Sequence, residues 1–571
     1  MSATYDLVNS RLAKAFESVL AGADPVLRPS DRSDYQANGV MAMSKALGKP
    51  SREVAEMVVA NLEFGDMGTI EIAGPGFLNI SLSAAFLSSQ LSSLLEDARL
   101  GVETASSQNV VIDYSAPNVA KEMHVGHLRS TVIGDALARM YRFKGHHVIP
   151  RNHVGDWGTP FGKLIEHLLD MGEDAAVATL SIGDLDTFYR EANAKFEADD
   201  TFKERSRLRV VALQSGDPET RRLWRILVDQ SVAYFSEVYA KLDVLLTPDD
   251  VVGESYYNDM LQAVVDDLQA AGLLVESDGA LCVFPEGFVN RDGDPLPLIV
   301  QKRDEGFGYA ATDLAAVRDR VHNLKANEIL YVVGAPQAQH LDMIYTVARS
   351  AGWLPESIRC EHVPFGNVLG KDHKMFKSRA GTTVKLVDLL DEAIDRADSQ
   401  LKERSTDLSD DARHELATSI ARAAVKYADL STERQRDYVF ELDRMLAFEG
   451  DTGPYLQYAH ARIESIFRKL DTSVELKGTS FALAEPQAWQ LALGLVEFPV
   501  AFESAFRDLL PHRLCTYLFD LAQRFTSFYD ACPVLSATGD LQRERLALCR
   551  LTGDTLKLGL SVLGIDAPEK M

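Results

Sequence analysis

The stretch NVVIDYSAPNVAKEMHVGHLR, Asn109 to Arg129, decides the fold of the chain around it. It begins with a short run of aliphatic residues, which predicts a buried parallel strand. After a Pro-Asn loop, apolar residues recur at helical spacing from Leu128 to Tyr141, and Gly145 stands where a helix C-cap is expected. Another strand-like segment, His147 to Ile149, follows. The stretch therefore predicts a strand–loop–helix–strand unit.

The predicted helix begins at His124-Val125-Gly126-His127. The first turn of a helix carries unpaired N–H groups and the positive end of the dipole, so it attracts phosphate. Two imidazoles three residues apart lie on one face of that turn, and the glycine between them lets a ligand approach the backbone. This predicts a phosphate site. The alternative, a pair of surface histidines without a ligand, stays open for so short a motif.

Length and composition restrict the class of protein. The 571 residues suggest about three to four domains. A net charge of −25 argues against non-specific coating of nucleic acid, although a local basic face remains possible. The five scattered cysteines form no C-x-x-C pair, which fits free thiols in a reducing cytoplasm and disfavours a zinc site. No signal peptide or membrane-spanning run is recognised, so we expect a cytoplasmic protein.

Along the chain, an α+β pattern comes first, then the predicted sheet unit, a helical and charged segment that interrupts it, and further strands. The remainder is helical, with predicted helices at Arg413–Ala428, Arg434–Phe448 and Tyr455–Leu470. Between strands and helices lies Gly370 to Gly381, with four Lys/Arg among twelve residues. A basic loop between glycines is suited to binding a polyphosphate, although most isolated basic segments are solvated surface loops without a ligand.

Taken together, these features resemble the class I aminoacyl-tRNA synthetases. The two signatures of that class are His124-Val125-Gly126-His127 and Lys374-Met375-Phe376-Lys377-Ser378 in this sequence. Within the class, the chain is similar to the arginyl-tRNA synthetase family over essentially its whole length. The segments that carry this resemblance are SAPNVAKEMHVGHLRST (115–131), NHVGDWGTPFG (152–162), KSRAGTTVKLVDLLDEA (377–393), FEGDTGPYLQYAHARI (448–463) and GLSVLGIDAPEKM (559–571).

The resemblance implies an arginine–tRNA ligase that forms arginyl-adenylate from arginine and ATP, with Mg²⁺ from solution, and then charges tRNA(Arg). The arginine carboxylate is already a nucleophile, so the site must align reactants and neutralise phosphate charge. The family's catalytic and ATP-binding positions are matched here by His124, Gly126, His127, Lys374, Lys377 and Ser378. The family's arginine-binding positions are matched by Ser115, Asn118, His127, Asn152, Tyr309, Asp313 and Gln337.

Asp313 is the residue that would pair with the arginine guanidinium, which needs a carboxylate and flat partners. Tyr309 lies four residues before it, on the same face if the segment is helical. Without the resemblance, Asp313 would be read as a helix N-cap or a surface acid. Departures from the family pattern include Phe376 in the second signature and Pro160 after Gly-Thr.

The resemblance also implies the architecture and the tRNA contacts. We expect an N-terminal α+β domain (1–105), a Rossmann-like parallel-sheet catalytic domain (106–395, with a helical insertion at about 163–300) and an all-helical anticodon-binding domain (396–571). Phe77 and Asn79 would contact the tRNA D-loop from a strand edge. Aromatic residues of the last helices could read the anticodon or simply form core. We expect a monomer.

Two other functions are weighed against this one. A class I synthetase for another amino acid is disfavoured by Asp313 and by the lack of zinc ligands. A tRNA-binding relative without catalysis is disfavoured by the presence of His124, His127, Lys374 and Lys377.

Overall fold

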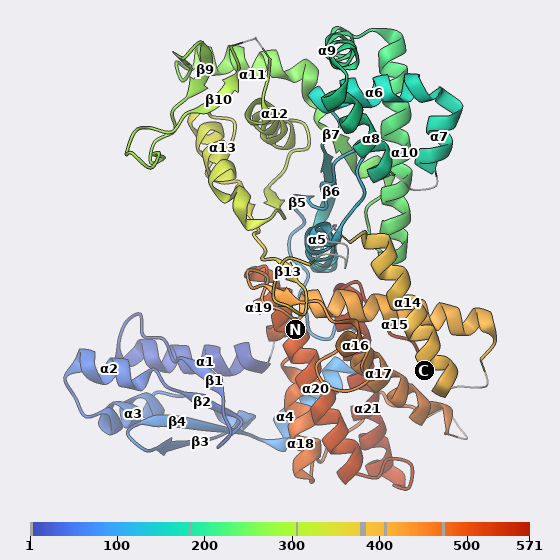
Figure 1. Cartoon of the computed structure of the whole chain (residues 1–571). Helices are drawn as coiled ribbons and strands as arrows, with labels where there is room; N and C mark the ends of the chain where they lie inside the picture. Colours follow the sequence, from blue (N-terminus) through green and yellow to red (C-terminus); the bar gives the residue numbers. More distant parts are fainter. Residues whose placement is uncertain (1–3, 182–184, 304–305, 377–383, 405–407, 471–473) are drawn as a thin grey trace. The chain divides into compact units, whose positions relative to one another are not determined.

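The computed structural model describes residues 4–181, 185–303, 306–376, 384–404, 408–470 and 474–571 (Figure 1). It separates into two compact units. One consists of Met1–Thr104, Phe448–Ser561 and Asp566–Met571, and the other of Ala105–Ala447 and Val562–Ile565. The three-domain boundaries derived from the sequence stay a prediction.

A parallel sheet lies at the centre of the second unit, with the strand order β12-β11-β5-β6-β7. These strands are β5 (Asn109–Asp113), β6 (His147–Val154), β7 (Val251–Gly253), β11 (Glu328–Tyr331) and β12 (Arg359–His362). Val110, Val111 and Ile112 of β5 have no exposed surface, as expected for a strand covered on both faces. Helix α5 (Val125–Lys144) follows β5 and ends at Gly145, whose φ is +103°. The predicted strand–loop–helix–strand unit is therefore present.

The helical insertion separates β6 from β7. It contains α6 (Thr159–Met171), α7 (Glu173–Ser181), α8 (Leu185–Ala198), α9 (Asp200–Ser215) and α10 (Pro218–Leu242). After β7 come α11 (Asn258–Ala270) and an antiparallel sheet made of β8 (Val275–Ser277), β9 (Ala280–Val283) and β10 (Leu298–Gln301). Helices α12 (Tyr309–His322) and α13 (Ala338–Ser350) then flank β11 in the chain, and side chains of α11, α12, α13 and β11 share one apolar core.

The rest of this unit consists of β13 (Val368–Leu369), α14 (Leu386–Arg404), α15 (Asp410–Leu430), β14 (Tyr438–Val439) and α16 (Leu442–Met445). The prediction of a helix over Arg434–Phe448 is wrong. The Tyr438 and Phe440 N–H groups donate to the carbonyls of Asn367 and Leu369, so β14 pairs with β13. This strand pairing leaves only the short α16 as helix, because tertiary contacts override the helical periodicity of the segment.

The N-terminal part of the first unit is an α+β arrangement. Its helices are α1 (Thr4–Val19), α2 (Val40–Leu47), α3 (Ser51–Ala60) and α4 (Ala84–Leu94). Its sheet has the order β1-β2-β4-β3, with β1 (Leu27–Pro29), β2 (Tyr35–Ala37), β3 (Gly68–Ala73) and β4 (Phe77–Leu82). Asn79 therefore does not lie on a strand edge, because it pairs with β2 on one side and β3 on the other, whereas Phe77 pairs with β3 alone. They lie on the sheet face opposite the buried Leu78 and Ile80.

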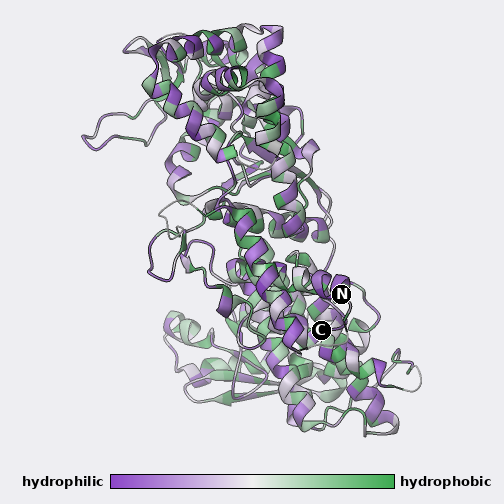
Figure 2. Cartoon of the chain, turned by 45° about the vertical axis from the view of Figure 1, so that its right-hand side comes forward, coloured by the Kyte–Doolittle hydropathy of each residue, from purple (hydrophilic) through white to green (hydrophobic). Residues whose placement is uncertain are grey.

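The C-terminal part of the first unit is helical: α17 (Gly453–Arg468), α18 (Pro486–Val496), α19 (Phe498–Arg507), α20 (Pro511–Ala531) and α21 (Gly539–Val562). Phe525 and Phe528 of α20 are buried, so for them the core alternative is confirmed. Figure 2 shows hydrophilic and hydrophobic residues alternating along the helices, as amphipathic packing requires. Within the described ranges, no helix combines the length and hydropathy needed to cross a membrane. The predicted fold class is confirmed in its parallel sheet, helical insertion, α+β module and helical C-terminal part.

Candidate active site

The two histidines cap the first turn of α5 reciprocally. The Gly126 N–H donates to Nδ1 of His124 at 3.0 Å, and the His124 N–H donates to Nδ1 of His127 at 3.1 Å. The ring centroids lie 4.0 Å apart. A Cβ at Gly126 would lie 2.7 Å from Cε1 of His124, so the glycine makes room for the folded-back ring. Because each Nδ1 accepts a hydrogen bond, the proton of each neutral ring sits on Nε2 and can be donated to a ligand.

The pKa values of both rings are lowered, which favours their neutral form. Burial is the main cause that lowers the pKa of His127 to about 3, and the neighbouring His124 lowers it further. Burial also lowers the pKa of His124. Since a neutral imidazole of this tautomer is a hydrogen-bond donor through Nε2, the arrangement suits stabilising phosphate oxygens without proton transfer.

We expect the imidazole signal of His127 to show no titration from pH 8 down to about pH 5, and that of His124 to titrate with a midpoint below its unfolded value. The folded-state pKa lies below the unfolded value, so the unfolded chain binds protons first as the pH falls. The contribution of these rings to the free energy of unfolding is therefore fully present above about pH 6.5, and it decreases as the pH falls below that value. Histidine-selective NMR of the native protein measures the titration, with the urea-unfolded chain as control. A native midpoint near the unfolded one would contradict this assignment.

The loop between β5 and α5 is strained and tightly held. Ser115 and Ala116 have positive φ angles of +75° and +47°, an unfavourable conformation for residues with a Cβ. The Ser115 N–H donates to Oγ of Ser130 at 2.8 Å, and Oγ of Ser115 contacts the Tyr239 hydroxyl at 2.8 Å. Asn152 accepts from the Ala116 N–H at 2.9 Å and donates to the same Tyr239 hydroxyl at 2.8 Å. The side chains of Ser115 and Asn152 are thus buried and joined through Tyr239.

Asn118 differs from these residues because it is exposed. Its backbone pairs with that of Gly155 after β6, and a Cβ at Gly155 would lie 2.6 Å from the Asn118 side-chain oxygen. Asn118 therefore lies beside the carboxyl ends of β5 and β6. This is the edge at which open α/β sheets bind ligands.

Tyr309 and Asp313 lie one turn apart on α12, as the spacing suggested. Tyr309 is the first residue of the helix and is 75% exposed. The N-cap is Gly308, so the alternative reading of Asp313 as an N-cap is wrong. Oδ2 of Asp313 lies 2.6 Å from Nε2 of His340 on α13, and this hydrogen bond is the main cause that raises the pKa of His340. Gln337 precedes α13 and is exposed.

Glu254 is a further acidic residue near this position that the sequence analysis did not identify. It follows β7 directly, at the same carboxyl edge of the sheet. Burial raises its pKa to about 8, and the charges of Asp156 and Asp313 contribute to the rise. Among the described residues, no hydrogen bond or ion pair is formed by Glu254. The carboxylate of Asp156, in contrast, accepts hydrogen bonds from the N–H and the hydroxyl of Ser255 at 2.9 and 2.6 Å. A cation between Glu254 and Asp313 would relieve their repulsion.

The basic loop that begins at Gly370, called the lysine loop from here on, leaves β13 as a tight hairpin over its described residues 370–376. The backbones of Leu369 and Met375 pair, and the ring of Phe376 lies 5.4 Å from that of Phe440. Lys374 is exposed to solvent. Lys377 and Ser378 lie outside the described residues, so their predicted roles rest on the sequence.

Sequence and structure comparisons identify the family. The catalytic-domain model of class I tRNA synthetases (R) matches residues 90–442, a DALR anticodon binding domain matches 456–571, and an arginyl tRNA synthetase N-terminal domain matches 5–82. An arginine–tRNA ligase from Thermobifida fusca is 53% identical over 99% of the chain and 98% of the relative. The ligase from Salmonella gallinarum is 48% identical over 99% of both chains. The chain belongs to the arginyl-tRNA synthetase family.

The crystal structure of an arginyl-tRNA synthetase from Plasmodium falciparum has a TM-score of 0.85 to this chain, at 29% identity and with full coverage of both. Membership of this family makes the chain a class I aminoacyl-tRNA ligase for arginine, so the predicted family and enzyme class are confirmed. As in other class I synthetases, activation uses ATP.

In this synthetase, the far end of the lysine loop is attached to the histidine signature. The backbone of Lys385 pairs with that of His124, and the Leu386 N–H donates to the Met123 carbonyl at 2.8 Å. Nζ of Lys385 lies 2.8 Å from a carboxylate oxygen of Glu122, whose side chain is 2% exposed. Burial raises the pKa of Glu122, and the hydrogen bond from Lys385 opposes that rise. These contacts hold the end of the loop beside the first turn of α5, and no sequence signal indicated them.

Proposed function

We propose that the chain joins arginine to tRNA(Arg) in two steps at the carboxyl edge of the five-stranded parallel sheet. The main support for this proposal is the reciprocal capping of His124 and His127. It leaves the Nε2–H group of each neutral ring available at a helix N-terminus to donate to a phosphate. In the first step, the arginine carboxylate attacks the α-phosphorus of ATP. A carboxyl–phosphorus bond forms and the bond to pyrophosphate breaks.

The residues of the chain bind and orient in this step and transfer no proton. Nε2–H of His124 and of His127 donates to phosphate oxygens, and Gly126 leaves room for adenine. Lys374, Lys377 and Ser378 neutralise and hold the departing pyrophosphate. Mg²⁺ arrives bound to ATP as part of that substrate. In the second step, a hydroxyl of the 3′-terminal adenosine of the tRNA attacks the arginyl carbonyl, AMP leaves, and its phosphate accepts the proton.

We further propose that Asp313 and Glu254 receive the guanidinium, with Tyr309 and Gln337 at its sides. An arriving cation favours the charged form of Glu254 and competes with His340 for Asp313. Asn118 binds the α-amino and carboxylate end of arginine together with the loop at Ser115, which Asn152 supports. All five cysteines lie in the described part of the chain and are free thiols. This supports our proposal of a cytoplasmic location, and we also propose a monomer.

The deciding experiment is charging of total tRNA with each labelled amino acid. We expect attachment of arginine alone. Attachment of another amino acid would contradict the specificity, and tRNA binding without any attachment would favour a non-catalytic tRNA-binding protein.

For the tRNA contact, we propose that Phe77 stacks on a D-loop base from the open face of the N-terminal sheet, beside Asn79. Asn79 accepts a hydrogen bond from Gln36 at 2.7 Å, which leaves its amide N–H₂ as a donor. Replacing Phe77 with Ala should raise the KM for tRNA about tenfold, since base–aromatic stacking contributes about 1–3 kcal/mol. The KM for arginine should not change. Steady-state charging measures both, and equal changes in the two constants would count against a tRNA contact.

A further inference from the structure

The last turn of α10 contacts the loop between β5 and α5, where we have proposed that arginine binds. Tyr239 lies in this turn, and its hydroxyl is the shared partner of Ser115 and Asn152, at 2.8 Å from each. The ring is buried, so the hydroxyl position follows the helix end. A shift of that turn would therefore displace Ser115, which belongs to the strained loop, and Asn152, which accepts a hydrogen bond from the loop at Ala116.

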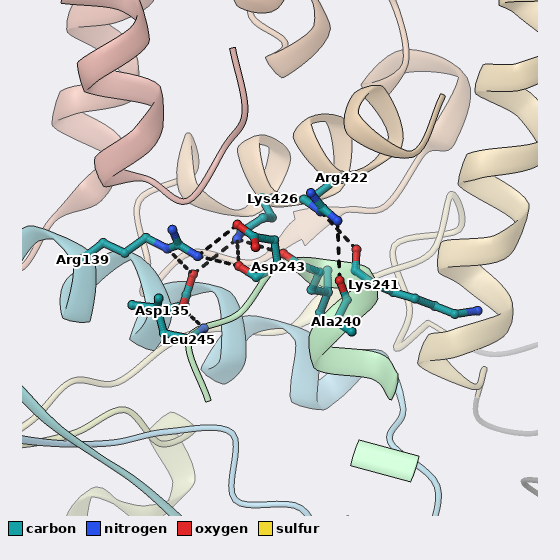
Figure 3. Close-up of polar contacts among 9 residues, drawn as sticks. Asp135, Arg139, Ala240, Lys241, Asp243, Leu245, Arg422 and Lys426 are labelled. Atoms are coloured by element: carbon teal, nitrogen blue, oxygen red, sulfur yellow. Dashed lines mark hydrogen bonds and ion pairs between the residues drawn. The ribbon is translucent and has the colours of Figure 1, made fainter. Parts of the chain in front are cut away.

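Cationic side chains from two other helices hold this turn in place (Figure 3). A helix C-terminus has unpaired carbonyls and the negative end of the dipole, which cations satisfy. Nζ of Lys426 donates to the Leu242 and Asp243 carbonyls at 3.0 and 3.2 Å. Nη2 of Arg139 donates to the Asp243 carbonyl at 2.6 Å, and Nε of Arg422 donates to that of Lys241 at 3.2 Å.

Asp135 of α5 binds two of these cations, Arg139 and Lys426. Its Oδ2 accepts from Nε of Arg139 at 2.8 Å and from Nζ of Lys426 at 3.3 Å, and its Oδ1 accepts from the Leu245 N–H at 2.7 Å. The side chains of Asp135 and Lys426 are completely buried. A buried ammonium is stable only when it is paired and fully hydrogen-bonded, so the loss of one partner disturbs the whole cluster.

The C-terminal segment Val562–Ile565 closes the cluster. It belongs to the same compact unit as the sheet, although the residues on either side of it do not. Gly564 has a φ of +71°, and a Cβ there would lie 2.7 Å from Nζ of Lys426, 2.8 Å from Nε of Arg139 and 2.9 Å from Oδ2 of Asp135. The backbone of this turn therefore packs directly on the charged groups, with no space for a side chain.

We propose that the Gly564 turn and the Asp135–Arg139–Lys426 cluster position Tyr239, and that Tyr239 positions the arginine-binding loop. Tyr239 is thus a positioning residue for arginine activation that does not touch the substrate. This inference rests on the proposed function, because it assumes that arginine binds beside Ser115, Asn118 and Asn152. A substitution in the C-terminal turn should then weaken arginine binding through a chain of contacts that begins far away in the sequence.

The first test replaces Tyr239 with Phe, which keeps the ring and removes both hydrogen bonds. We expect the KM for arginine in tRNA-supplemented ATP–pyrophosphate exchange to rise about tenfold, with the KM for ATP within about twofold of the unsubstituted enzyme. Thermal unfolding is recorded in parallel. A lower Tm with an unchanged KM for arginine would show a merely structural role and overturn the proposal.

The second test perturbs the cluster by Gly564→Ala and Lys426→Met, with Arg422→Gln as a milder variant if Lys426→Met does not fold. Each should raise the KM for arginine about three- to tenfold. Gly478→Ala is the matched glycine control, because Gly478 has a φ of +68° with nothing within 4 Å of an added Cβ. Lys241→Met is the matched charge control, because Lys241 lies in the same turn of α10 as Tyr239 but its Nζ pairs with Asp391 of α14, outside the cluster. Both controls should leave the KM for arginine unchanged.

Combining the substitutions tests the chain of contacts directly. If the cluster acts through Tyr239, adding Gly564→Ala to Tyr239→Phe should raise the KM for arginine no further. Multiplied effects in the double variant would overturn the proposal. Failure of the proposed function would give a different result. It predicts arginine-dependent exchange by the unsubstituted enzyme, whereas the present inference predicts only how the variants differ from that enzyme.

Discussion

Replacing Asp313 with Asn should raise the KM for arginine about 100-fold and leave the KM for ATP nearly unchanged. A charge-assisted hydrogen bond to guanidinium contributes about 1.5–3 kcal/mol, and the amide also leaves a donor facing the cation. Since Asp313 is on α12 and the proposed phosphate donors are on α5, only the amino-acid substrate should be affected. Arginine-dependent ATP–pyrophosphate exchange with tRNA present gives both constants.

The matched control is Asp267→Asn, which removes a carboxylate of α11 whose ion pair with Arg318 is 2.7 Å long. Both variants lose one charge and one ion pair, but only Asp313 lies at the proposed pocket. Glu254→Gln should also raise the KM for arginine, by a smaller factor, because this acid is mainly protonated before the cation arrives. An Asp313→Asn enzyme with unchanged affinity for arginine would rule out this pocket.

Replacing His127 with Asn should lower kcat for arginyl-adenylate formation about 100-fold. The Asn side-chain oxygen can take the place of Nδ1 and keep the hydrogen bond from the His124 N–H, so the helix cap survives. What disappears is the outward donor at Nε2, and removing one such donor from a developing phosphate charge costs about 10²–10³ in rate. Single-turnover formation of the adenylate measures this effect.

His127→Gln is the complementary variant, because its amide N–H₂ reaches the place of Nε2 and keeps a donor there. We expect it to be about ten times more active than the Asn variant. If the Asn and Gln variants are equally slow, or if both lose stability to the same extent, His127 serves the helix cap and not the phosphate.

The elements around β5 and α5 could be predicted from the sequence because their signals are local. A fully apolar strand, a loop and an apolar stripe at helical spacing lie within about forty consecutive residues, and Gly145 marks the helix end. The positions of Tyr309 and Asp313 on one helix face followed in the same way from their spacing of four residues. The reciprocal histidine cap was not expected, although both histidines were assigned to the helix start.

The sequence-based predictions were wrong or incomplete where contacts with a distant segment determined the structure. Helical periodicity over Arg434–Phe448 was overridden by pairing of β14 with β13, which lies about seventy residues earlier. Asn79 was assigned to an edge because the short strand β2 has almost no sequence signal. Glu254 has no motif, and its significance came from burial beside Asp156 and Asp313.

The sequence by itself determined the family, the chemistry and the local elements, because motif residues and periodicities are properties of short segments. Only the tertiary structure decided which groups are buried, paired or left without a partner. It tied the hydroxyl of Tyr239 to Ser115 and Asn152, Lys385 to Glu122, and the Gly564 turn to Lys426. Each of these contacts joins segments more than 80 residues apart, and their stability depends on exclusion of water, which no local pattern encodes.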